Sequence, residues 1–133
     1  MAPEKAPAEL ITKTTITYPS LFEISVPAMA PINVTASNVS STIILLQWQT
    51  IPLNFSNGPI LEYRITYIEV EGNDSKVKQE GRWEKIIDGQ ETMAHVTGLK
   101  KFTKYQFRMA GVNKLGVGVD SMPVTASTDQ DSK

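Results

Sequence analysis

Four asparagines stand in Asn-x-Ser/Thr triplets, the pattern in which the side-chain amide nitrogen of asparagine accepts an N-linked glycan. None of the triplets has proline in the middle, and each falls on an expected loop or outward strand position. The chain contains six asparagines and 23 serines and threonines, so about one such triplet would arise by chance. The alternative is that these residue types coincide because all of them favour turns. The excess favours glycosylation in a secretory setting, and the candidate acceptors are Asn33, Asn38, Asn54 and Asn73.

The sequence offers little other chemistry. His95 is the only histidine, and it alternates with Ala94 and Val96, so a core that contains these two residues turns the imidazole towards solvent. The chain has no cysteine, and it lacks the Gly-x-Ser-x-Gly, His-Glu-x-x-His, phosphate-loop and calcium-loop motifs. The glycine pair in Gly116-Val117-Gly118 fits a hairpin turn better than a nucleotide loop. We therefore expect no catalytic, cofactor-binding or metal site, and no enzyme activity.

The charge balance excludes partners that are recognised through bulk charge. The 133 residues carry 13 basic and 14 acidic side chains, a net charge of −1, so no long-range field draws the protein to nucleic acid or an anionic membrane. A local cluster of Lys100, Lys101 and Lys104 is expected to be a solvated corner. No window of about 18 apolar residues exists, and the first residues lack the apolar core of a secretion signal. If the parent protein is membrane-bound, this chain is expected to be a piece of it that does not itself insert.

Hydrophobic residues alternate with polar ones along most of the chain, which is typical of strands with one buried face. Around Tyr105, for example, Phe107 and Met109 share one side, while Gln106 and Arg108 share the other. Seven strands are expected, at 31–36, 42–49, 61–70, 83–87, 92–97, within 99–118, and at 119–127. The pattern predicts an all-β sandwich of two antiparallel sheets. Its expected core consists of Leu46, Trp48, Tyr63, Ile65, Leu99, Tyr105 and Phe107.

The central stretch carries a resemblance to a known family. Leu99 stands six residues before Tyr105, and an Asn-Lys-Leu-Gly turn begins at Asn113. Further matches lie in two other expected strands: Leu46 with Trp48, and Tyr63 with Ile65. Over residues 31–128 this pattern resembles a fibronectin type III domain. The resemblance implies a seven-stranded immunoglobulin-like sandwich of Greek-key topology, in which the tyrosine hydrogen-bonds back to upstream backbone. It also implies that the parent is a multi-domain cell-surface adhesion molecule or receptor.

Composition divides the chain into three parts. Residues 1–27 contain four prolines among small and polar residues, and they are expected to form a linker or a flexible N-terminal extension. Within them, Ile11–Tyr18 has a strand-like composition and could be the last strand of a preceding domain. Residues 28–128 form the expected fibronectin type III-like domain, and residues 129–133 form a flexible tail. The polar stretch Glu71–Gly81 is an expected insertion in a surface loop.

Two groups of residues are candidate contacts with a partner. Strand alternation turns Ile43 and Leu45 outwards, beside Met93 and His95 of the neighbouring strand. We expect this face to be a domain contact or to be shielded by a glycan on Asn33, although scattered apolar residues at a surface can also be without consequence. The second group lies in the turn after the central strand and comprises Lys114, Leu115 and Val117.

Together these observations predict a non-catalytic extracellular module that acts as a spacer and a protein-binding surface. Its expected partners are other proteins and the neighbouring domains of the same chain, and it is expected on the extracellular side of the plasma membrane or secreted. One alternative is a membrane-proximal module of a cytokine-type receptor, although the sequence has no Trp-Ser-x-Trp-Ser motif. Another is an intracellular structural module of a muscle-type filament protein, in which the Asn-x-Ser/Thr triplets would be incidental.

Overall fold

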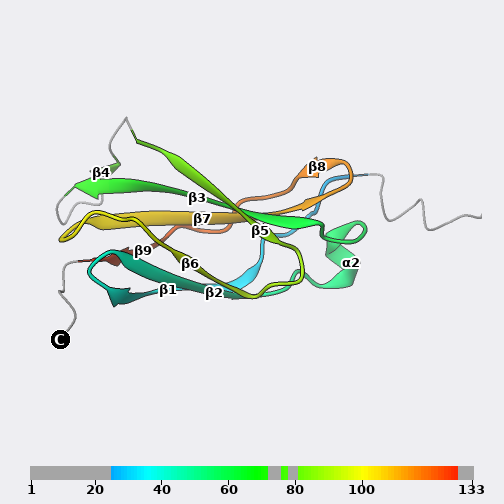
Figure 1. Cartoon of the computed structure of the whole chain (residues 1–133). Helices are drawn as coiled ribbons and strands as arrows, with labels where there is room; N and C mark the ends of the chain where they lie inside the picture. The colour runs from blue at the N-terminus through cyan, green and yellow to red at the C-terminus, as the bar shows by residue number, and fades with distance from the viewer. Residues whose placement is uncertain (1–24, 72–75, 78–80, 129–133) are drawn as a thin grey trace, which may run out of the picture.

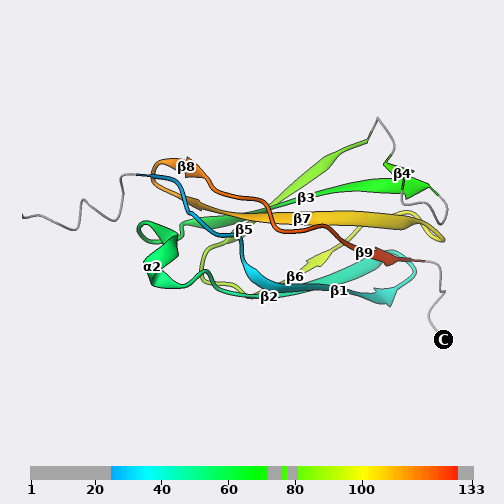
Figure 2. The same ribbon diagram turned by 180° about the vertical axis from the view of Figure 1, so that it is seen from behind.

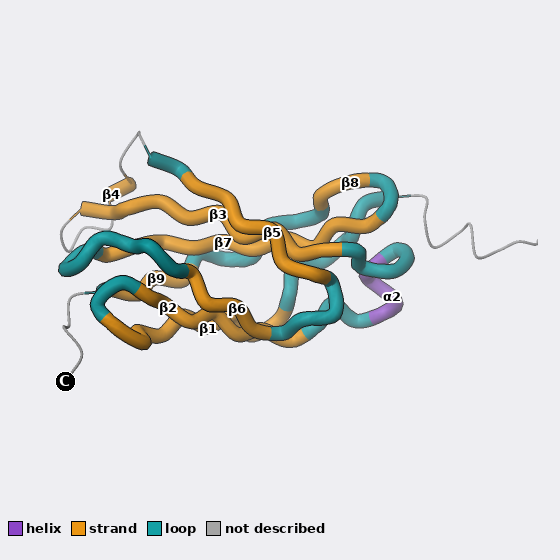
Figure 3. The backbone as a smooth tube through the Cα atoms, viewed as in Figure 1, coloured by secondary structure: helices purple, strands orange, loops and turns teal. Residues whose placement is uncertain are grey.

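The computed structural model describes residues 25–71, 76–77 and 81–128, which form two β-sheets packed face to face (Figure 1). One short helical turn, α2, interrupts the strands of this part of the chain (Figure 3). In chain order the elements are β1 (Ile32–Ser40), β2 (Ile43–Gln49), α2 (Leu53–Ser56), β3 (Glu62–Glu71), β4 (Lys76–Val77), β5 (Trp83–Asp88), β6 (Met93–Val96), β7 (Lys104–Asn113), β8 (Gly116–Val117) and β9 (Val124–Ser127).

All the strand pairs that the structure describes are antiparallel. The smaller sheet has the order β1-β2-β6. In the larger sheet β3 and β7 lie at the centre, with β4 and β5 along the far edge of β3 and with β8 and β9 along the far edge of β7. This architecture confirms the expected all-β sandwich of two antiparallel sheets. The two-residue strands β4 and β8 are additions, which lie in the expected loop insertion and the expected hairpin turn.

Period-two alternation builds the core between the two sheets. All seven residues expected in the core are at most 6% exposed. Trp48 of β2 packs its ring against that of Tyr63 of β3 in an edge-on arrangement, with a centroid distance of 5.5 Å. Burial of rings of this size is a large favourable contribution to folding. Every second pair of the β3–β7 register faces the core. These pairs include Tyr63 with Gly111, Ile65 with Met109, and Tyr67 with Phe107.

The strand ends depart from the sequence-based expectation in three places. Leu61, expected inside the third strand, lies one residue before β3 and is 57% exposed. The first strand continues four residues beyond its expected end, to Ser40. The last strand begins only at Val124. In the segment before β9, Ser121 bonds to β7 through one backbone group and its side chain. Its N–H donates to the carbonyl oxygen of Met109 at 2.7 Å, and its hydroxyl accepts from the N–H of Met109 at 3.0 Å.

The hydrogen bond that the family resemblance implies for the central tyrosine is present. The Tyr105 hydroxyl accepts from the backbone N–H of Lys100 at 3.0 Å, and this bond closes the loop between β6 and β7. Thr128 is tied to the same loop, because its Oγ1 accepts from the N–H of Thr103 at 3.1 Å and donates to the carbonyl oxygen of Lys100. The last described residue therefore leaves the sandwich at this end.

Asn113, which is 3% exposed, joins three segments at the opposite end of the sandwich. Its Nδ2 lies within hydrogen-bond distance of the carbonyl oxygens of Ser25 (2.9 Å), Ser56 (3.1 Å) and Asn57 (2.9 Å). Its Oδ1 accepts from the N–H of Leu115 at 2.9 Å. One side chain thus holds together the start of the described chain, the end of α2 and the turn between β7 and β8.

Residues 25–27, which the sequence places in the linker, pack on the domain beside β8 (Figure 2). Asn57 Nδ2 donates to the carbonyl oxygen of Val26 at 2.8 Å, and Pro27 is buried. Gly118 makes room for this segment, because a Cβ at that position would lie 2.5 Å from the carbonyl oxygen of Pro27. Gly116 lies next to Val26, where a Cβ would be 3.4 Å from a methyl group, and its φ of +140° favours glycine. Residues 26 and 27 therefore pack directly against the two glycines of the hairpin.

Candidate functional site

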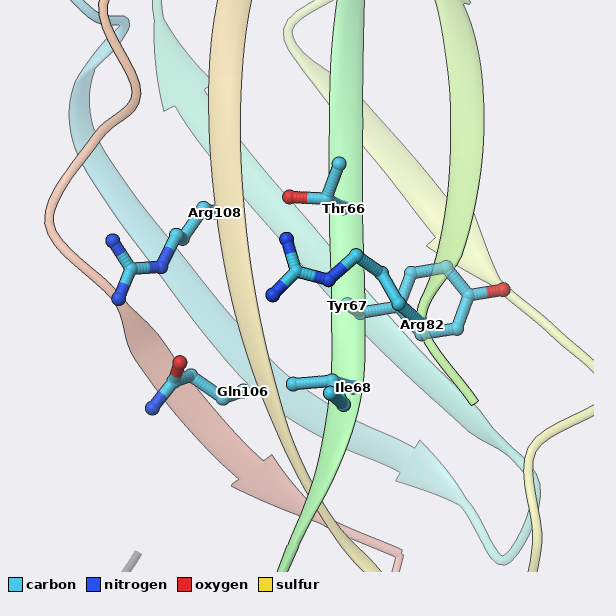
Figure 4. A pocket seen from close by; sticks show the side chains of 6 residues that line it. All are labelled: Thr66, Tyr67, Ile68, Arg82, Gln106 and Arg108. Carbon is cyan, nitrogen blue, oxygen red and sulfur yellow. The ribbon is translucent and has the colours of Figure 1, made fainter. Parts of the chain in front are cut away.

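Side chains that alternate with the core residues cover the outer face of the larger sheet. On β3 they include Thr66 and Ile68, and the strand register places Thr66 beside Arg108 and Ile68 beside Gln106 of β7. Arg82 stands directly before β5, and its side chain extends across β3 (Figure 4). Three segments that are far apart in the sequence therefore contribute to one patch of this face.

These side chains border a cleft of about 20 Å³, which we call the arginine cleft; it is lined by Thr66, Tyr67, Ile68, Arg82, Gln106 and Arg108. In Figure 4 the guanidinium group of Arg82 lies over the sheet between Thr66 and Ile68, on the side that faces β7. A polar cavity of about 10–15 Å³ already holds a water molecule. The arginine cleft thus has the size for one small polar group and is too small for a drug-sized ligand.

The arginine cleft carries positive charge, because the acids Glu62 and Glu84 pair with Arg64 and not with the two arginines of the cleft. Arg64, further along β3, is paired twice, since its Nη2 lies 3.4 Å from Glu62 Oε2 and its Nε lies 3.6 Å from Glu84 Oε2. Within the described part of the chain neither Arg82 nor Arg108 forms an ion pair, and both are exposed. Two guanidinium groups that form no ion pair with any described residue make this a suitable place for an anionic group.

Three of the four candidate glycan acceptors lie in the described residues, and Asn73 lies outside them. Asn33, Asn38 and Asn54 are all exposed. Asn33 lies on β1, where its Nδ2 donates to Oε1 of Gln49 on β2 at 3.1 Å. Asn54 lies in α2, at the end of the sandwich where the described chain enters. Solvent therefore reaches all three acceptor side chains.

Asn38 has a structural role that the sequence does not reveal. Its Nδ2 donates to the carbonyl oxygens of Ser40 and Ser127, each at 2.9 Å. The second bond links β1 of the smaller sheet to β9 of the larger sheet. The two strands lie side by side (Figure 2). A glycan replaces one of the two amide hydrogens, so it would remove one of these bonds.

The candidate partner contacts fall in two separate places. Ile43 and Leu45 are half-buried on the outer face of β2, where the register sets Leu45 beside the exposed His95 of β6. Met93, also exposed, lies on the same strand as His95 and completes this face. The second group is exposed at the turn between β7 and β8, where the described chain enters: Lys114, Leu115 and Val117.

Sequence reasoning missed two parts of these surfaces. Leu53 (84% exposed) and Phe55 (41% exposed) extend the second group, because Asn113 ties the end of α2 to the turn between β7 and β8. The available signal was a pair of apolar residues between two turn prolines. Arg82 and Arg108 were also missed as a pair, because only the folded sheet brings these distant residues to one cleft.

An aromatic cluster closes the gap between the sheets beside β5. Trp83, which is 39% exposed, stacks on Tyr67 with a centroid distance of 5.6 Å. Tyr67 in turn stacks on Phe107, also at 5.6 Å. A hollow of about 190 Å³ beside the cluster is bounded by Gly98–Lys100 of the loop between β6 and β7. Tyr67 therefore sits in a largely apolar setting.

This setting predicts a loss of stability in alkali. Burial raises the pKa of Tyr67 above its ordinary value of 10.0, and the nearby Tyr105 raises it further. Burial also raises the pKa of Tyr63. The unfolded chain therefore loses these protons first, so the stabilisation is complete below about pH 10 and is lost as the pH rises further. We expect the Tm from calorimetry to fall as the pH rises above about 10, and to fall less steeply in a Tyr67→Phe variant. Equal slopes in the two proteins would contradict this prediction.

Among the described residues no group of three or more histidine, aspartate or glutamate side chains is placed to hold a metal ion. None of the helical residues in the same part of the chain forms a helix long and apolar enough to cross a membrane.

Comparison with known proteins gives one family and a consistent set of relatives. Residues 29–127 match the family model described as the fibronectin type III domain. Protein sidekick-1 of Gallus gallus is 36% identical over 108 residues, which is 80% of this chain and 5% of that protein. Neogenin of Mus musculus is 37% identical over 109 residues (82% and 6%), and contactin-3 of Homo sapiens is 34% identical over 102 residues (77% and 9%). The chain thus spans less than a tenth of the length of these relatives.

Solved structures agree in architecture. The third fibronectin III domain of human KIAA0343 protein superposes with a TM-score of 0.68 and 27% identity, over 92% of this chain and 96% of that chain. The FN5 domain of Drosophila Lar gives a TM-score of 0.59 and 26% identity, over 76% and 95% of the two chains.

Proposed function

Because the chain belongs to the fibronectin type III family, we propose that it is a non-catalytic extracellular module that spaces and contacts other domains within a cell-surface adhesion molecule or receptor. The relatives support this proposal, since sidekick-1, contactin-3 and neogenin are cell-surface adhesion molecules and receptors. Receptor-type tyrosine-protein phosphatase F of Bos taurus, 31% identical over 110 residues, is a receptor by its name.

The observation that carries the spacer role is the position of the two ends of the described chain. The chain enters beside α2 and β8, where Ser25 is bonded to Asn113, and it leaves at the opposite end, where Thr128 is bonded to Thr103 (Figures 1 and 2). A strand of ten residues such as β7 spans about 33 Å. Segments joined to the two ends are therefore held apart by roughly that length.

The positions of the glycan acceptors support a division of labour between the two sheets. Asn33 and Asn38 lie on β1 of the smaller sheet, and Asn54 lies at the end where the chain enters. Within the residues that the structure describes, no acceptor lies on the outer face of the larger sheet. We propose that sugar on β1 shields the smaller sheet, including its exposed apolar side chains, and that the outer faces of β3 and β7 stay open for protein contacts.

Secretion from mammalian cells tests the extracellular proposal. We expect the secreted chain to carry N-linked glycan at Asn54 and Asn33, because both side chains are exposed and no backbone bond in the described part of the chain uses their Nδ2. Intact mass spectrometry before and after peptide-N-glycosidase treatment measures the modification. Asn54→Gln and Asn33→Gln variants should each lose the mass of one glycan.

Asn57→Gln provides the matched control for this experiment, since Asn57 is close to Asn54 in the sequence but stands outside any Asn-x-Ser/Thr triplet. Its glycan mass should equal that of the parent chain. An unchanged mass at all four candidate asparagines would overturn the extracellular proposal and favour an intracellular structural module.

A further inference from the structure

We infer that the arginine cleft binds the carboxylate of an acidic side chain on a protein partner. The inference deepens the proposed function, on which it rests for the existence of a protein partner, by naming the surface and the chemistry of the contact. Its first step is the donor content of the cleft. Arg82 and Arg108 each present five N–H donors in a planar fork, and Thr66 and Gln106 add a hydroxyl and an amide. Such a set matches the planar, acceptor-only carboxylate group.

The second step concerns size and depth. At about 20 Å³ the arginine cleft has room for a single small group of a ligand, such as one side-chain head. Ile68, which is 6% exposed, forms an apolar part of its lining. An ion pair next to apolar surface is less screened by water than one on an open surface, so the contact is favoured at this position of the sheet.

The third step is that two acids of the described strands on this face, Glu62 and Glu84, are paired with another arginine. Glu84 lies beside Thr66 in the strand register, yet its carboxylate pairs with Arg64, whose Nε lies 3.6 Å from Glu84 Oε2. Glu62 pairs with the same Arg64. Within the described residues the two cleft arginines therefore form no ion pair with an acidic side chain, so their guanidinium groups are available to an external carboxylate.

The fourth step separates a protein partner from a polyanion. Glu62, Glu84 and Asp88 lie on the same outer face, because they alternate with the inward residues of β3 and β5. A sulfated polysaccharide needs a continuous run of basic side chains, and along this face it would meet these three acids. A protein surface of mixed charge can set an acidic side chain over the arginine cleft and avoid like charges elsewhere. The half-exposed Ile86 on this face adds apolar contact area for such a surface.

The test uses the full 133-residue chain, labelled with ¹⁵N and made in bacteria so that no glycan is present. The probes are two pentapeptides blocked at both ends, acetyl-Gly-Gly-Glu-Gly-Gly-amide and its Gln counterpart, so that one carboxylate is the only difference. The chain has three arginines, so each Nε–Hε resonance can be followed separately. We expect the Glu peptide to shift the resonances of Arg82 and Arg108 in a saturable manner, with a dissociation constant of about 1–10 mM.

Variants and salt sharpen this expectation. Arg82→Gln and Arg108→Gln should each weaken binding about two- to five-fold, and the double variant about ten-fold or more. Lys101→Gln removes the same charge in the exposed loop between β6 and β7, and it should leave binding unchanged. Raising NaCl from about 50 to 500 mM should weaken binding, whereas the Gln peptide should cause no saturable shift at either salt concentration.

Three outcomes would overturn the inference. The first is an absence of saturable shifts with the Glu peptide, and the second is an equal response of the paired Arg64, which would indicate unspecific association. The third is binding of a heparin octasaccharide at Arg82 and Arg108 without binding of the Glu peptide, which would make the ligand a sulfated sugar. None of these results depends on secretion or glycosylation, so a failure here is distinct from a failure of the extracellular proposal.

Discussion

Replacing Asn113 with aspartate is expected to lower the free energy of unfolding by about 3 kcal/mol or more. The native Nδ2 serves three backbone carbonyl oxygens in a site that is 3% exposed. Asn113→Asp keeps the shape of the side chain but sets a buried carboxylate against these oxygens. Each lost bond leaves an unsatisfied acceptor at a cost of about 1–3 kcal/mol, and the buried charge adds to that cost. Urea denaturation followed by circular dichroism measures the effect.

Asn38→Asp is the matched control for this substitution. The Asn38 amide also donates to two carbonyl oxygens, each at 2.9 Å, but its side chain is exposed. Water can replace those bonds, so we expect a cost of about 1 kcal/mol or less. If both variants lose the same free energy, Asn113 does not have the joining role that we assign to it.

Phe107→Ala is expected to cost about 3–5 kcal/mol. Phe107 is fully buried, with its ring centroid 5.6 Å from that of Tyr67 and 6.3 Å from that of Tyr105. Truncation removes its apolar contacts and leaves a cavity between two rings that β3 and β7 hold in place. Because a domain of this size has a total stability of about 5–15 kcal/mol, the variant should melt far below the parent chain. Calorimetry at neutral pH measures the change in Tm.

Phe102→Ala makes the same chemical change on the surface. Phe102 is 66% exposed in the loop between β6 and β7, and its φ of 54° is unaffected by shortening the side chain to alanine. We expect its stability to stay within about 0.5 kcal/mol of the parent. A large loss from Phe102→Ala, or a small loss from Phe107→Ala, would contradict the placement of the core.

If the proposals hold, the two faces of the sandwich have different tasks. Sugar on β1 shields the smaller sheet, while the arginine cleft presents two guanidinium groups on the larger sheet that form no ion pair within the described residues. A rigid sandwich suits this division, since each face is fixed by its own strand alternation. The arrangement also separates the lateral contact from the two ends, where the chain enters and leaves.

Much of the architecture was predictable from the sequence because strand alternation is local. Successive side chains of an extended strand point to opposite faces whatever the rest of the chain does, so Tyr105, Phe107 and Met109 indicated a buried face directly. The ends of strands were less predictable. Leu61 continues the apolar alternation, yet it lies outside β3 and is exposed.

The sequence alone determined the two-sheet sandwich, the seven core residues and the four triplets that offer a glycan acceptor, since each follows from a pattern of neighbouring residues. Only the tertiary structure decided which outward side chains meet. Asn113 looked like part of a turn, and its burial comes from Ser25 and Ser56, 88 and 57 positions away. Arg82 and Arg108 reach one cleft because the segment before β5 and the paired strands β3 and β7 meet there, whereas Arg64 pairs with Glu62 and Glu84. Register depends on how the whole core packs, and no local pattern contains that information.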